Sequence, residues 1–189
     1  MQAVIVLFVR RGVHIPAQRF GRPGEGLAFA VDEAAVELAQ AQEPAEDSNL
    51  TALGKALFFD EELSVNGTQS CATCHAPEAG FVGPDSLVND STVVYQGALP
   101  NHFGNRKPPT AAYAGDSFEL FFDEVDQGWF GGMFWDGRAT GAALGDPLAE
   151  QAQGPFLNPL EQALPNSQVL CVKVKQAEYA GLFEDVWGA

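Results

Sequence analysis

Basic residues and cysteines are both scarce in this chain of 189 residues. Ten lysines and arginines stand against 25 aspartates and glutamates, which gives a formal net charge of −15. Because phosphate binding needs a basic surface, we do not expect nucleic acid as a partner. With only three cysteines, the chain also lacks the two cysteine pairs typical of structural zinc sites. An acidic surface favours a basic partner, such as a small positively charged redox protein, although acidic residues also serve solubility alone.

The chain has no long apolar run near its N-terminus. Residues 3–9 form an apolar run of seven, which is far too short to cross a bilayer. Arg10 and Arg11 follow this run, whereas a secretory signal peptide has its basic residues first. Glycine-rich and acidic segments come next, with a short amphipathic helix expected at residues 31–41. We therefore expect residues 1–47 to be a leader or linker outside the core and residues 48–189 to form one domain.

The most informative segment is Cys71-Ala72-Thr73-Cys74-His75. Two cysteines three apart, with a histidine directly after the second, are the attachment signature of a c-type haem. One helical turn places the two thiols under the two vinyl groups of a porphyrin, so that both can form thioethers. The imidazole of His75 can then bind the iron. The segment predicts one covalent haem c per chain, with His75 as the metal ligand.

Two other kinds of site use similar cysteine spacing. A zinc site would need ligands from outside the motif, because Cys171 is the only further cysteine. A thioredoxin-type redox pair would need a preceding strand, whereas residues 64–70 are typical of a polar loop. The haem interpretation is favoured over both, and Cys171 is left without an assigned role.

Twenty glycines and twelve prolines predict short helices separated by irregular segments. Residues 167–176 are ambiguous because Val172 and Val174 alternate with Lys173 and Lys175, but Ser167 as a cap favours a helix there. Helices are also expected over residues 50–59, 108–114 and 179–186. In the first of these, Ser48 or Asn49 would be the cap, and Leu50, Leu53 and Leu57 would form the buried face.

Two more helices are expected to begin at Asp146-Pro147 and Asn158-Pro159, where a capping side chain precedes a proline. Aromatic residues are dense over residues 117–136, and core packing is the usual explanation for such density.

Several further segments match one family. They are residues 53–60, residues 63–68 before the haem motif, Arg106 with Pro109-Thr110, and residues 134–139, 150–161 and 179–183. From about residue 50 onward, the chain resembles the bacterial di-haem cytochrome c peroxidases, including the MauG branch. The resemblance implies an all-α, cytochrome c-like haem domain with short helices and long irregular loops. It also implies an oxidoreductase that reduces hydrogen peroxide and transfers electrons through haem.

The resemblance implies roles for particular residues as well. Gln151 and Glu161 match the pair that lines the distal pocket, where Glu161 would move a proton and Gln151 would orient the peroxide. Pro155 matches a proline of that pocket. Trp135 matches the tryptophan between the two haems and could relay electrons.

Two arginines, Arg106 and Arg138, could pair with the haem propionates, although both also suit an ordinary surface position. The sixth iron position could be open or closed by His102 or Met133. A solvent-facing loop suits His102 better, and a core position suits Met133 better. Lys107 stands where an asparagine often binds calcium in the family, so no calcium site is assigned.

No second C-x-x-C-H motif follows, although family members carry a second haem domain. The electron donor would therefore be a small redox protein or a separate haem domain, and a mono-haem electron carrier without peroxidase activity is the rival interpretation. The long connection between Arg138 and Gln151 resembles the MauG branch. Because covalent haem attachment takes place outside the bacterial cytoplasm, the expected location is the periplasm.

Overall fold

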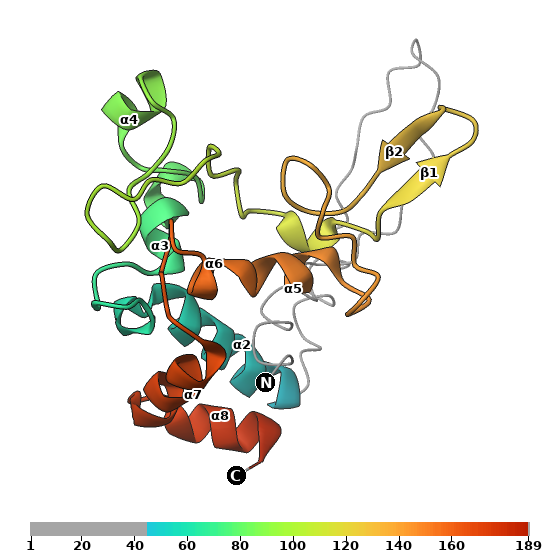
Figure 1. The fold of residues 1–189 in the computed structure, drawn as a ribbon. Coiled ribbons are helices and arrows are strands. Elements are labelled where there is room, and N and C mark those ends of the chain that lie inside the picture. The colour runs from blue at the N-terminus through green and yellow to red at the C-terminus, as the bar shows by residue number, and fades with distance from the viewer. Residues whose placement is uncertain (1–44, 189) are drawn as a thin grey trace, which may run out of the picture.

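The computed structural model describes residues 45–188, and Figure 1 shows a group of helices with long irregular segments at its outside and one hairpin reaching away from it. The expected helix at residues 31–41 and the leader at residues 1–47 lie wholly or largely outside the described residues. The longer elements are α2 (Ala45–Phe59), α7 (Ser167–Gln176) and α8 (Ala180–Trp187). The shorter helices are α3 (Cys71–Cys74), α4 (Ser86–Asp90), α5 (Pro147–Ala152) and α6 (Gly154–Leu157). Three 3₁₀ turns complete them: η1 (Glu61–Leu63), η2 (Pro77–Ala79) and η3 (Ala114–Asp116).

The main hydrophobic core lies between α2 and the two C-terminal helices. Its buried side chains are Leu53, Leu57, Leu63, Phe156, Leu164 and Val174. The expected face of α2 is confirmed at Leu53 and Leu57, but the expected cap is wrong. The helix begins at Ala45, so Ser48 and Asn49 are inside it.

Helices α7 and α8 confirm the two helices at the C-terminal end, but the cap of α7 is the Asn166 side chain and not Ser167, which is the first residue of the helix. A hydrogen bond of 2.5 Å joins the Tyr179 hydroxyl to the Asp60 carboxylate, and the Lys173 ammonium donates to the Glu62 carbonyl at 2.6 Å. These contacts attach the C-terminal helices to the segment that leads into the haem motif.

Two proline-led helices were expected in the middle of the chain, and one is confirmed. Asp146 accepts hydrogen bonds from the backbone N–H groups of Leu148 and Ala149, and α5 begins at Pro147. At Asn158-Pro159 the expectation is wrong, because the chain makes a turn there and the α6 helix lies before it. Residues 108–113 are not helical either, and only the short η3 begins at Ala114.

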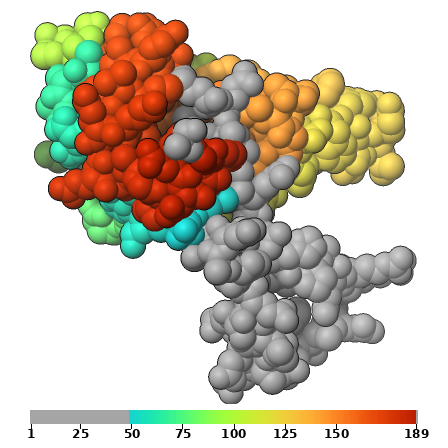
Figure 2. All heavy atoms as spheres, turned by 90° about the horizontal axis from the view of Figure 1, so that it is seen from below, coloured from blue at the N-terminus to red at the C-terminus, as the bar shows by residue number. Residues whose placement is uncertain are grey.

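The structure is helix-rich, as expected, but it is not strictly all-α. Strands β1 (Phe121–Asp123) and β2 (Gly128–Phe130) pair as an antiparallel hairpin. In Figure 2 this hairpin, in yellow, extends from the body of the molecule. Core packing was the wrong explanation for its aromatic residues, because Phe121, Phe122, Trp129 and Phe130 are all exposed. Within residues 45–188, no helix is both long and apolar enough to cross a membrane.

Candidate haem and peroxide site

The two cysteines of the motif lie on the single turn of α3. The preceding loop is shaped by Ser64, whose buried hydroxyl accepts hydrogen bonds from the N–H groups of Thr68 and Gln69 at 3.0 and 3.1 Å. The Ser70 N–H then donates to the Thr73 hydroxyl at 3.0 Å, which fixes the first turn of the helix. Both thiols are free and half-buried. They therefore stand one helical turn apart, as thioether attachment to one porphyrin requires.

The pKa values of the two thiols argue against a redox-active cysteine pair. Burial raises the pKa of Cys71 to about 12 and that of Cys74 to about 11. Reactive cysteine pairs have lowered thiol pKa values, because the thiolate is the nucleophile. These thiols stay protonated at neutral pH, which does not suit a thioredoxin-type pair.

The imidazole of His75 is held by a backbone carbonyl. Its Nδ1 lies 3.2 Å from the carbonyl oxygen of Phe81, and burial lowers the pKa of the ring. If Nδ1 carries the proton and donates it to this carbonyl, Nε2 is the nitrogen that could bind a metal. Phe81 has a φ of 60°, a left-handed conformation that is rare for a bulky residue, and the Phe81 ring contacts Phe58 from α2.

Glu161 is half-buried and is electrostatically linked to the haem motif. Burial raises the pKa of its carboxyl, although a hydrogen bond with Asn158 and the charge of Arg138 oppose the shift. In turn, the charge of Glu161 raises the pKa values of Cys71 and Cys74. The structure thus brings together the predicted acid–base residue and the predicted haem-binding residues, which are about 90 positions apart in the sequence.

The backbone around Glu161 is fixed by close contacts with two other segments. Ala98 donates its N–H to the Glu161 carbonyl at 2.8 Å. Gly97 faces the Leu160 and Glu161 carbonyls so closely that a Cβ at this position would overlap them. On the other side, the buried Gln162 donates its amide to the Gln69 carbonyl at 3.4 Å, and the Gln162 carbonyl accepts from Val65 at 2.8 Å.

Gln151 and Pro155 lie on α5 and α6, and both are half-buried. The turn that leads into α5 is anchored by Glu150, whose carboxylate accepts hydrogen bonds from the N–H groups of Gly141, Ala143 and Leu144. No hydrogen bond joins Gln151 to Glu161 within the described residues. Their joint role at a distal pocket therefore stays a prediction.

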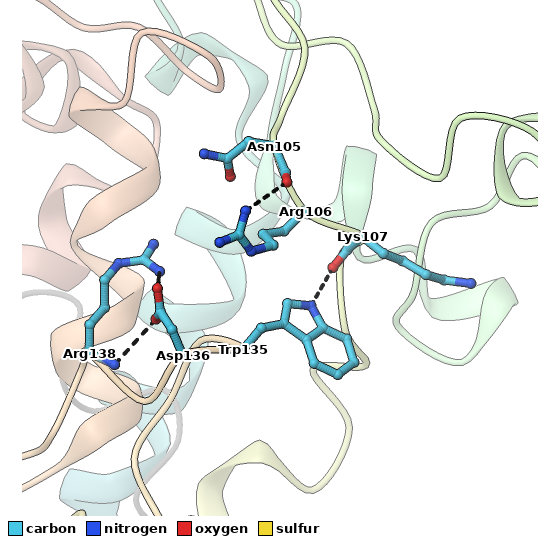
Figure 3. Close-up of polar contacts among 6 residues, drawn as sticks. All are labelled: Asn105, Arg106, Lys107, Trp135, Asp136 and Arg138. Atoms are coloured by element: carbon cyan, nitrogen blue, oxygen red, sulfur yellow. Dashed lines mark hydrogen bonds and ion pairs between the residues drawn. The ribbon is translucent and has the colours of Figure 1, made fainter.

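Trp135 and the two arginines lie on exposed segments of chain. In Figure 3 the Trp135 indole N–H donates to the Lys107 carbonyl at 2.9 Å, and 65% of Trp135 is exposed. Arg138 forms an ion pair with Asp136 at 2.8 Å and lies over the Phe134 ring. Arg106 donates to the Asn105 carbonyl.

The remaining candidates lie apart from these contacts. His102 is an exposed loop residue whose Nδ1 lies 3.0 Å from the Pro100 carbonyl oxygen, and Met133 pairs by its backbone with Ala139. Cys171 is a free, half-buried thiol on α7. Within residues 45–188 no cluster of three or more histidine, cysteine, aspartate or glutamate side chains could hold a metal ion.

Sequence reasoning missed four residues that build the site: Ser64, Gln69, Gly97 and Gln162. The buried serine and glutamines carry no motif of their own, and their burial follows from contacts between distant segments. The glycine could have been recognised only from the contact it allows.

Comparisons with known proteins agree with this arrangement. The family described as di-haem cytochrome c peroxidase matches residues 48–189. The methylamine utilization protein MauG of Paracoccus denitrificans is 38% identical over 151 residues, which cover 79% of this chain and 37% of that protein. The cytochrome c551 peroxidase of Nitrosomonas europaea is 31% identical over 144 residues, which cover 76% of this chain and 35% of that protein.

A solved structure shows the same likeness. The crystal structure of the diheme peroxidase BthA from Burkholderia thailandensis matches with a TM-score of 0.63 and 32% sequence identity, over 73% of this chain and 32% of that one. The chain thus spans about a third of the length of the relatives it matches. The family is di-haem, whereas this chain carries one haem motif. On this evidence the chain belongs to the di-haem cytochrome c peroxidase family, whose members are haem-dependent oxidoreductases.

Proposed function

We propose that residues 48–189 form the domain of a periplasmic peroxidase in which hydrogen peroxide is reduced. The observation that supports this most directly is the position of the half-buried Glu161 carboxyl, which is near enough to the haem motif for its charge to raise the pKa of both cysteine thiols. Cys71 and Cys74 would hold one haem c by thioethers, and His75 would bind the iron through Nε2. When bound, haem would supply the iron at which peroxide accepts two electrons and two protons to give two molecules of water.

Glu161 has the properties of a group that moves a proton. Burial raises the pKa of its carboxyl above the usual value of 4.5, which brings the group closer to neutral pH. The ionised carboxylate would take the proton from the near oxygen of peroxide and return it to the departing oxygen. The Asn158 contact and the fixed backbone hold the carboxyl in place for this transfer.

Other side chains would support this step. The Gln151 amide would donate a hydrogen bond to peroxide and orient it, and Pro155 would limit the space beside it. The Trp135 indole, at the surface, would relay electrons from a small redox protein or a second haem domain. Arg106 and Arg138 would balance the negative charge of the haem propionates.

The acid–base assignment is tested with Glu161→Gln in the haem-loaded chain. Mixing with peroxide in a stopped-flow spectrometer should show a second-order rate about 10²–10⁴-fold below that of the parent, because the variant has no proton acceptor. The parent rate should rise with pH through an apparent pKa above 4.5, and the variant should lose this dependence. Glu178→Gln, at an exposed position, is the matched control and should react like the parent. A Glu161→Gln rate equal to the parent rate would refute the assignment.

Covalent attachment is tested separately. If two thioethers attach the haem, its absorbance should stay with the protein in acidic organic solvent, whereas a haem held only through its iron would be extracted. Extraction from the matured chain would rule out haem c. A fully low-spin ferric spectrum would favour the electron carrier instead, provided that the haem also fails to react with peroxide after it has been reduced.

A further inference from the structure

The hairpin of β1 and β2 exposes aromatic side chains on both of its faces. Phe121 pairs with Phe130, and their rings stack at 6.0 Å with Phe118 beside them. Phe122 pairs with Trp129 on the other face at 5.5 Å. Exposed aromatic clusters of this kind are typical of interaction surfaces in soluble proteins, because burying them in a partner removes a large apolar area from water.

The hairpin is ordered by its own contacts. At its tip, the Asp123 carboxylate accepts hydrogen bonds from the N–H groups of Val125 and Asp126 at 2.7 and 2.9 Å. At its base, Gly132 donates to the Phe118 carbonyl at 2.9 Å. A surface that is already ordered loses little conformational entropy when it binds.

Charge identifies the kind of partner. No lysine or arginine lies between Lys107 and Arg138, whereas this segment contains six acidic residues: Asp116, Glu119, Asp123, Glu124, Asp126 and Asp136. A second copy of the chain would present the same negative charge, so self-association through this surface would be opposed by repulsion. A basic surface would be attracted instead, and lysines could also lie over the exposed aromatic rings.

We propose that this hairpin, residues 118–132, is the docking surface for a small basic redox protein that carries lysines around an apolar centre. The choice of a redox protein rests on the proposed function, which needs an electron donor. Trp129, 68% exposed, is the apolar anchor, and Glu124 and Asp126 at the tip attract the basic rim. Trp135, the proposed electron relay, follows β2 by only a few residues in the sequence and is also exposed.

The test is a calorimetric titration of the haem-loaded chain with a small basic cytochrome c as the probe, at low and at physiological ionic strength. Binding should weaken as salt rises, since the charges are exposed. Trp129→Ala should weaken binding about tenfold or more. The pair Glu124→Gln/Asp126→Asn should weaken it severalfold at low salt and reduce the dependence on salt.

Matched controls are Trp187→Ala and the pair Glu178→Gln/Glu184→Gln, all at exposed positions on or near α8. Both should bind the probe like the parent, and haem absorbance and circular dichroism should show that every variant is folded. Parent-like binding by Trp129→Ala, or no binding by the parent, would overturn the proposal. Sedimentation showing a parent dimer that Trp129→Ala dissociates would also overturn it, in favour of a second copy. Because binding needs no peroxide, its failure is distinguishable from failure of the Glu161 rate test.

Discussion

Adding a single methyl group at Gly97 should displace the backbone of Glu161 from its place in the site. An added Cβ would lie 2.7 Å from the Leu160 carbonyl carbon and 2.8 Å from the Glu161 carbonyl oxygen, and closer still to the Leu160 carbonyl oxygen. All three atoms belong to the backbone, so no side-chain rotation can relieve the overlap. Gly97→Ala must therefore move the backbone that carries the proposed acid–base residue.

The size of the effect follows from these distances. Carbon atoms pack best at about 3.5–4.0 Å, and forcing an extra methyl group into a packed site costs about 1–3 kcal/mol. Gly97 donates its N–H to His102 at 2.7 Å, and Ala98 donates to Glu161 at 2.8 Å. Weakening these two bonds would add about 1 kcal/mol. We expect Gly97→Ala to lower the free energy of unfolding by about 2–4 kcal/mol, or Tm by roughly 4–16 °C in a chain of this size.

Thermal unfolding measured by circular dichroism checks the stability, and stopped-flow mixing with peroxide checks the site. The peroxide rate should fall even at temperatures where the variant is fully folded, because the Glu161 carboxyl is displaced. Gly181→Ala is the matched control: nothing lies within 4 Å of a Cβ there, and in α8 the alanine should be neutral or stabilising by up to about 1 kcal/mol. If Gly97→Ala unfolds within about 0.5 kcal/mol of the parent and reacts at the parent rate, the close backbone contact does not hold Glu161.

Three further changes test other contacts. Ser64→Ala leaves the buried N–H group of Gln69 and the partly buried N–H group of Thr68 without their acceptor and should lower stability by about 1–3 kcal/mol in urea unfolding. Tyr179→Phe removes the hydroxyl that joins α8 to Asp60 and should cost about 1–2 kcal/mol, whereas Tyr113→Phe, at an exposed loop position, should cost nothing measurable. Desolvation raises the pKa of Glu150, but the backbone N–H groups that donate to its carboxylate outweigh this and hold the pKa below 4.5. Its stabilisation should be present above that value and be lost as pH falls, so Tm measured from roughly pH 6 to pH 3 should fall less in Glu150→Gln.

The sequence predicted the parts of the structure that depend on local patterns. Spacing of apolar residues identified α2 and α8, and the capping aspartate before Pro147 identified the start of α5. The haem motif identified three residues that the structure does place on one short helix and its end. These predictions succeeded because the cause of each feature lies within a few neighbouring residues.

The predictions that failed depend on contacts between distant segments. Asn158-Pro159 has the local pattern of a helix start, yet the carbonyls of Glu161 and Gln162 accept hydrogen bonds from the distant Ala98 and Val65, and a turn results. The aromatic stretch was expected in a core, but strand pairing places its rings on a projecting hairpin. No local pattern in the sequence shows which surface a strand pair will leave open.

The hydrogen bond between His75 and Phe81 has a consequence for how the protein is assembled. It closes a loop of only a few residues, and the bridge between Ala76 and Val82 closes it further. Short loops form early and at little entropic cost, so the imidazole can be oriented while the rest of the chain is still unfolded. Glu161, the proposed proton-transfer residue, in contrast reaches its place only when segments distant in the sequence meet. A destabilised variant should therefore still attach haem under conditions in which it no longer reacts with peroxide.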